Sequence, residues 1–164
     1  MSFAFCPVAL LPAAVLGSWL FAASGQAKVP IAVIAHQQVP VSGLSLVELR
    51  RIFLGEQRFW SRYEMITLLM PPRGSRERKV MLDKIYGQRS EAQVQHYWIN
   101  KLFEDSAPSS PKITGSPRMS ASLVRSIPGA IALVPADSIP PGVKVLRVDG
   151  KLPGDSGYPL VPSG

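Results

Sequence analysis

Apolar residues recur along this chain in two patterns, and each pattern predicts a different kind of element. Unbroken apolar runs at 29–35, 65–70 and 130–134 predict buried strands. The segment 143–148 alternates apolar with basic residues, which is typical of an edge or half-exposed strand. Elsewhere apolar residues return every three or four positions. This spacing predicts amphipathic helices over 45–54, 75–86, 90–103 and 116–127.

Serine residues stand where three of these helices are expected to begin. Ser45 and Ser90 open capping boxes, because Glu48 and Gln93 follow three residues later and each pair satisfies backbone N–H groups at a helix start. Ser116 is placed to cap another helix, with a proline at its first position. Strands and helices therefore alternate, which predicts an α/β fold with a mostly parallel sheet flanked by helices.

The helix expected over 90–103 carries large apolar residues at helical spacing. They are Val94, Tyr97, Trp98, Leu102 and Phe103. Such a face is typical of a hydrophobic core, and stacking of the aromatic rings on a ligand is the alternative. A loop rich in proline and serine is expected to follow over 105–114.

The first 27 residues differ in composition from the remainder of the chain. They contain no charged residue and no histidine, and residues 8–23 form an apolar stretch rich in Ala and Leu. We interpret 1–27 as a signal peptide cleaved after Ala27, which leaves a domain at 28–164 that is periplasmic or secreted. Retention as a membrane anchor is the alternative, although the stretch is short of the roughly 20 apolar residues of a spanning helix. Cleavage would also remove Cys6, the single cysteine, and with it disulfides and thiolate chemistry.

The predicted domain is basic, and its polar residues favour binding over catalysis. Eighteen Lys and Arg against 11 Asp and Glu give a formal net charge of +7, and a basic domain attracts anions. No run of basic residues interleaved with aromatic ones is present, so nucleic acid is not an expected partner. The acidic residues form no matched pair, and His36 and His96 stand apart from any carboxylate cluster. Neither an enzyme site, a metal site nor a cofactor is therefore expected.

Three arginines gather where the strand at 65–70 passes through a turn into a helix. They are Arg73, Arg76 and Arg78. Basic residues at a helix start are unfavourable by roughly 0.3 to 1 kcal/mol each, because the helix dipole already places partial positive charge there. Their presence is explained if an anion binds to the guanidinium groups and the free backbone N–H groups together. Solvated arginines on an exposed turn are the alternative.

The series of motifs resembles the periplasmic phosphate-binding proteins of ABC transporters, which have a type II periplasmic-binding-protein fold. In order, the motifs are Leu44-Ser45, Glu48-Leu49, Ile52-Phe53-Leu54-Gly55, Trp60, Arg73-Gly74-Ser75, Arg78, Trp98, Phe103, Pro128-Gly129-Ala130-Ile131, Val145-Leu146, Asp149-Gly150 and Tyr158-Pro159-Leu160. The resemblance implies a short, one-lobed substrate-binding protein. It implies inorganic phosphate or a similar oxyanion as the ligand, with Arg73 at the position of the family's phosphate-binding arginine and Ser75 near its serine. Together with Gly74 and Arg76 on the same turn, these two residues form the expected anion-binding site.

Two departures from the family pattern bear on this expectation. The family's Ser-Gly-Thr turn is absent, since the chain reads Gly74-Ser75-Arg76, and Ala132 and Leu133 replace the last Gly and Tyr of Gly-Ala-Ile-Gly-Tyr. One lobe also leaves half of the anion in water, where ion contacts are worth about 0 to 1 kcal/mol each. We therefore expect weak binding, or binding completed by self-association or by an envelope protein. The alternative function is a non-binding interaction module of the cell envelope.

Overall fold

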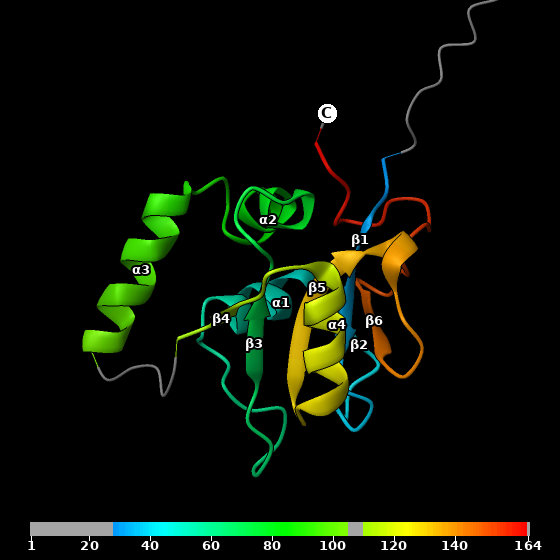
Figure 1. Ribbon diagram of the computed structural model, residues 1–164, viewed down its shortest axis with the longest axis horizontal. Coiled ribbons are helices and arrows are strands. Elements are labelled where there is room, and N and C mark those ends of the chain that lie inside the picture. The colour runs from blue at the N-terminus through cyan, green and yellow to red at the C-terminus, as the bar shows by residue number, and fades with distance from the viewer. Residues whose placement is uncertain (1–27, 105–109, 164) are drawn as a thin grey trace, which may run out of the picture.

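A six-stranded mixed sheet, in the order β2-β6-β1-β5-β3-β4, runs through the domain in the computed structural model (Figure 1). The structure describes residues 28–104 and 110–163, so the predicted signal peptide lies outside the described residues. The strands are β1 (Ile31–Ala35), β2 (Gly43–Leu44), β3 (Thr67–Met70), β4 (Lys112–Ile113), β5 (Ala130–Pro135) and β6 (Lys144–Val148). The predicted α/β class is confirmed.

Strand β1 is antiparallel to both of its neighbours, β5 and β6, whereas the remaining pairings are parallel. All five residues of β1 are fully buried, because helices cover both faces of the sheet at this point. Strand β6 is half-exposed as predicted but is not an edge strand, since the short β2 pairs with its outer side. Strand β4 lies inside the segment predicted to be a loop.

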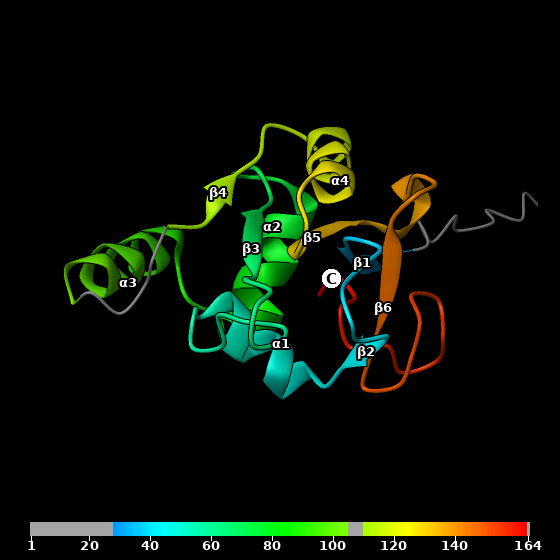
Figure 2. The same cartoon turned by 90° about the horizontal axis from the view of Figure 1, so that it is seen from below.

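Helices pack on both faces of the sheet (Figure 2). They are α1 (Leu46–Phe53), α2 (Arg76–Val80), the π-helical turn η1 (Met81–Ile85), α3 (Glu91–Phe103), α4 (Pro117–Ser126) and the short 3-10 turn η2 (Ala136–Ser138). On one face of the sheet, α4 packs against Ala32 and Ile34 in a smaller apolar core. On the other face, α1, α2 and η1 share a larger core with Ile31 and Val33. The serine caps at 45, 90 and 116 form as predicted. No helix among the described residues is long and apolar enough to cross a membrane.

The prediction for the apolar face of α3 is wrong at its C-terminal end. Val94 and Trp98 are buried, but Leu102 is exposed and Phe103 is 85% exposed. The reason is that α3 lies at one end of the molecule, beyond β4, so only its first turns reach the core (Figure 1). Met119 on α4 follows the helical spacing of Leu123 and Val124, which predicts burial, yet Met119 is exposed, because Ser120, Ala121 and Val124 form the face of α4 that packs on the sheet.

A buried hydrogen-bond chain joins the middle of α3 to the end of α1. The Trp98 Nε1–H donates to the Tyr86 hydroxyl over 3.0 Å, and that hydroxyl donates to the Phe53 carbonyl over 2.6 Å. Burial raises the pKa of the Tyr86 hydroxyl well above its ordinary value, so it stays protonated as this donor.

A Tyr86→Phe variant is expected to lose about 1 to 3 kcal/mol of unfolding free energy, because it leaves the Trp98 N–H and the Phe53 carbonyl buried without their partner. Urea unfolding followed by circular dichroism measures this loss. Tyr63→Phe is the matched control, since the Tyr63 side chain is fully solvated. Equal stability of the two variants would show that the chain of hydrogen bonds contributes nothing.

Candidate functional site

The segment Arg73 to Arg76 is a tight turn between β3 and α2. Two prolines end the strand, and the Ser75 N–H donates to the Pro72 carbonyl over 3.2 Å. Gly74 adopts the left-handed conformation, with φ of +78°, and a side chain there would meet nothing within 4 Å. Ser75 then caps α2, since its Oγ accepts from the Arg78 N–H over 3.1 Å. These two hydrogen bonds therefore hold the turn on its inner side, and the turn is open to solvent beside Gly74.

The four residues assigned to anion binding from the sequence lie together on this turn. Arg73, Gly74 and Arg76 are exposed, and Ser75 is half-buried. The Ser75 N–H is engaged within the turn, but no described residue accepts from the N–H groups of Arg76 and Glu77, which are the first two of α2. The Ser75 hydroxyl accepts one hydrogen bond and keeps its own proton to donate. The available donors are thus these two backbone N–H groups, the Ser75 hydroxyl and the exposed guanidinium groups.

Arg73 and Arg78 have different roles in the structure. The Arg73 guanidinium reaches α3, where it donates to the Gln95 side chain over 3.3 Å and remains solvated. Arg78 is buried, and its Nε and Nη2 each donate over 2.8 Å to the carboxylate of Glu91 at the start of α3. The hydrogen bonds from Arg78 hold the pKa of Glu91 below its ordinary value. Arg78 is therefore committed to an ion pair, whereas Arg73 and Arg76 are exposed and available to bind a ligand.

Glu77 is a residue near the turn that the sequence reasoning did not single out. It is the second residue of α2 and only 4% exposed. An acidic side chain in the first turn of a helix interacts favourably with the helix dipole. It also places negative charge close to the backbone donors of the turn, which weakens an anion bound there. The capping position of Ser75 was the available signal, because it assigns Glu77 to the first turn.

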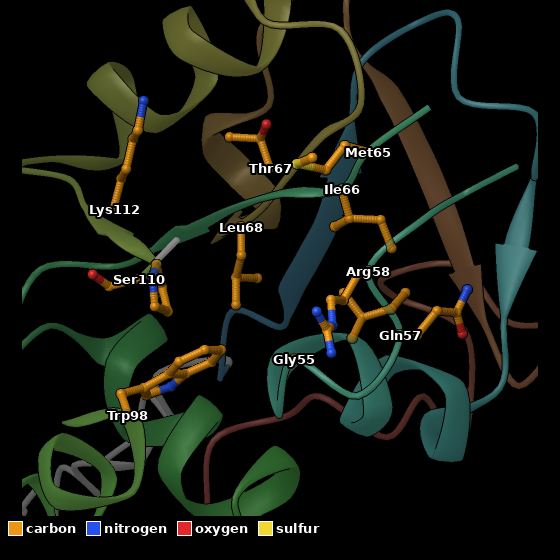
Figure 3. A pocket seen from close by; sticks show the side chains of 12 residues that line it. Gly55, Gln57, Arg58, Met65, Ile66, Thr67, Leu68, Trp98, Ser110 and Lys112 are labelled. Carbon is orange, nitrogen blue, oxygen red and sulfur yellow. The ribbon is translucent and has the colours of Figure 1, made fainter. Parts of the chain in front are cut away.

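Two pockets flank the buried Trp98 ring. A pocket of about 50 Å³ lies between Trp98, Leu68 and Arg58, and it has room for only a few water molecules (Figure 3). A cleft of about 180 Å³ lies on the side of Arg73, between α3 and β4. Among the described residues, no group of three or more His, Cys, Asp or Glu side chains could hold a metal ion.

The fold is shared with solved phosphate-transport proteins. A protein described as a phosphate ABC transporter substrate-binding protein from Clostridium perfringens, solved with bound phosphate, aligns over 74% of this chain and 45% of its own, with a TM-score of 0.58 and 22% identity. An ABC-type phosphate transport receptor from Vibrio cholerae aligns over 81% of this chain and 54% of its own, with a TM-score of 0.57 and 19% identity. PstS from Borrelia burgdorferi aligns over 82% of this chain and 55% of its own, with a TM-score of 0.63 and 13% identity.

These likenesses establish the fold, and the resemblance inferred from the motifs is confirmed at that level. The chain spans about half the length of these proteins, so the match is partial. No protein-family model and no curated protein matches the sequence.

Proposed function

We propose that this protein is an exported oxyanion-binding protein that binds phosphate or a similar anion at the turn Arg73 to Arg76. The observation that carries the proposal is the set of hydrogen-bond donors on this turn. Free backbone N–H groups, a hydroxyl and exposed guanidinium groups all occur within the five successive residues from Arg73 to Glu77. The fold supports it, since the similar protein from Clostridium perfringens was solved with bound phosphate. Export rests on the signal peptide inferred from residues 1–27.

The proposed binding is weak in a single copy of the chain. The turn is open to solvent beside Gly74, and the buried Glu77 carboxylate opposes an anion. A second copy of the chain or an envelope protein covering the open side would exclude water and strengthen each ion contact. The proposed site is therefore complete only when this side is covered.

Isothermal titration of the protein with phosphate is expected to show saturable binding that weakens about fivefold in Arg73→Ala. The factor follows from the value of an exposed charge contact, up to about 1 kcal/mol. Arg62→Ala is the matched control, because it removes the same charge from an exposed loop position away from the turn. Equal weakening of phosphate binding in both variants would show that the effect comes from the net charge of the protein and not from the position of Arg73. Absence of saturable heat at millimolar phosphate would contradict the proposal and favour the interaction module.

A further inference from the structure

The cleft beside Arg73 has an apolar floor and an apolar rim. Met70, Val94 and Trp98 form the floor and are buried. The rim carries Ile99, Leu102 and Ile113, which come from α3 and β4 and are all exposed. Three exposed large apolar side chains around one concave surface are more typical of a binding site than of an ordinary solvated surface.

The charged side chains among the described residues that line the cleft have one sign. They are Arg73 and Arg78, and none of the described lining residues is acidic. Glu91 forms its ion pair with Arg78 and also interacts electrostatically with Arg73, so these three residues leave one net positive charge, and Arg73 is the arginine outside the ion pair. Gln95, which accepts from Arg73, supplies a further polar group at the same place. The cleft therefore combines an apolar surface with a cationic end, and Arg73 belongs both to this cleft and to the turn assigned to oxyanion binding.

The size of the cleft limits what can occupy it. Its volume of about 180 Å³ exceeds the roughly 150 Å³ of an apolar cavity known to hold benzene. A phenyl ring or a branched alkyl group of similar size fits, whereas inorganic phosphate would leave the apolar floor in contact with water. A folded partner protein would need a much wider apolar surface than this cleft provides.

We infer that the ligand is an organic phosphate monoester, whose phosphate group binds at Arg73 while an apolar group of about the size of a phenyl ring fills the cleft between α3 and β4. This inference rests on the proposed function, because it places the phosphate at the same turn. Inorganic phosphate corresponds only to the phosphate group of this ligand and lacks its apolar group.

The inference is tested by titrating the protein with phenyl phosphate, inorganic phosphate and phenol. Phenyl phosphate is expected to bind at least tenfold more tightly than inorganic phosphate, and phenol more weakly than phenyl phosphate. Ile99→Asn is expected to reduce the ratio of the two phosphate affinities at least threefold, because it makes the rim polar. Ile113→Asn, on the other side of the rim, tests the same point if the first variant does not fold. Val47→Asn is the matched control, since Val47 is an exposed apolar residue on α1.

The outcomes separate the inference from the proposed function. Equal affinity for phenyl phosphate and inorganic phosphate would overturn the inference and leave the oxyanion site intact. Phenol binding as tight as that of phenyl phosphate, unchanged in Arg73→Ala, would overturn the link between the cleft and the arginine. An unchanged ratio in both rim variants would place the apolar group elsewhere and overturn the inference. Absence of binding by both phosphates would overturn the inference and the proposed function together.

Discussion

A Gly129→Ala variant is expected to lose more than about 3 kcal/mol of unfolding free energy and to yield little folded protein. Gly129 has a φ of +73°, and a Cβ atom there would lie 2.2 Å from the Met65 carbonyl oxygen. The left-handed conformation alone is unfavourable for alanine by about 1 to 2 kcal/mol. The contact with a backbone atom adds to this, because it is relieved only if one of the two segments moves.

Movement at Gly129 would break the junction between β3 and β5. The Gly129 carbonyl accepts from the Thr67 N–H over 3.0 Å and from the Trp60 Nε1–H over 2.9 Å. Each of these hydrogen bonds contributes about 1 kcal/mol. Because β3 leads directly into the turn at Arg73, the same displacement would reach the candidate site.

Gly150→Ala is the matched control for Gly129→Ala. Gly150 also has a positive φ, of +76°, but a Cβ atom there would meet nothing within 4 Å. This control is expected to lose only about 1 to 2 kcal/mol, from backbone conformation alone. Urea unfolding of both variants measures the difference. A Gly129→Ala variant as stable as Gly150→Ala would show that the approach of Met65 to Gly129 is not required by the fold.

A Glu91→Gln variant is expected to lose about 2 kcal/mol of unfolding free energy at neutral pH. The substitution removes the negative charge opposite the buried Arg78 guanidinium. Breaking a fully buried pair is unfavourable by about 3 to 5 kcal/mol, and the expected loss is smaller because the Glu91 side chain is 36% exposed. Glu56→Gln is the matched control, since its pair with Arg51 is solvated and is expected to contribute under 0.5 kcal/mol.

The contribution of Glu91 depends on pH in a defined direction. Its pKa is lowered in the folded protein, chiefly by the hydrogen bonds from Arg78, so the unfolded state takes up the proton first as pH falls. The stability difference between wild type and Glu91→Gln is therefore fully present above the ordinary pKa of 4.5. It is expected to shrink as pH falls through the lowered pKa. Urea unfolding at a series of pH values measures it, and a difference that grows on acidification would contradict the assigned ion pair.

The sequence was most informative where structure depends on neighbouring residues. The capping boxes at Ser45 and Ser90 join residues three apart, so the residue types alone predict them. The run Ala130 to Val134 is apolar throughout, as a strand covered on both faces must be. The turn at Gly74 and Ser75 was located for the same reason, since it lies between a strand signal and a helix signal.

Residue types did not reveal how side chains are partnered across the fold. Arg73, Arg76 and Arg78 look alike in the sequence, yet only Arg78 faces Glu91, which belongs to another helix. Leu102 and Phe103 continue the apolar spacing of α3, but the core ends before it reaches them. Helical periodicity shows which residues share a face and does not show how far along the helix that face is covered.

The sequence by itself determined the α/β class, the sites of the helix caps and the position of the turn at which we propose anion binding, because these follow from periodicity and local hydrogen bonding. The tertiary structure decided that β1 runs antiparallel to β5 and β6, and that Arg78 is committed to Glu91. It also decided that α3 and β4 enclose an apolar cleft beside Arg73. Each of these depends on residues distant in the chain meeting in space, and such contacts are fixed only when the sheet and its helices pack together.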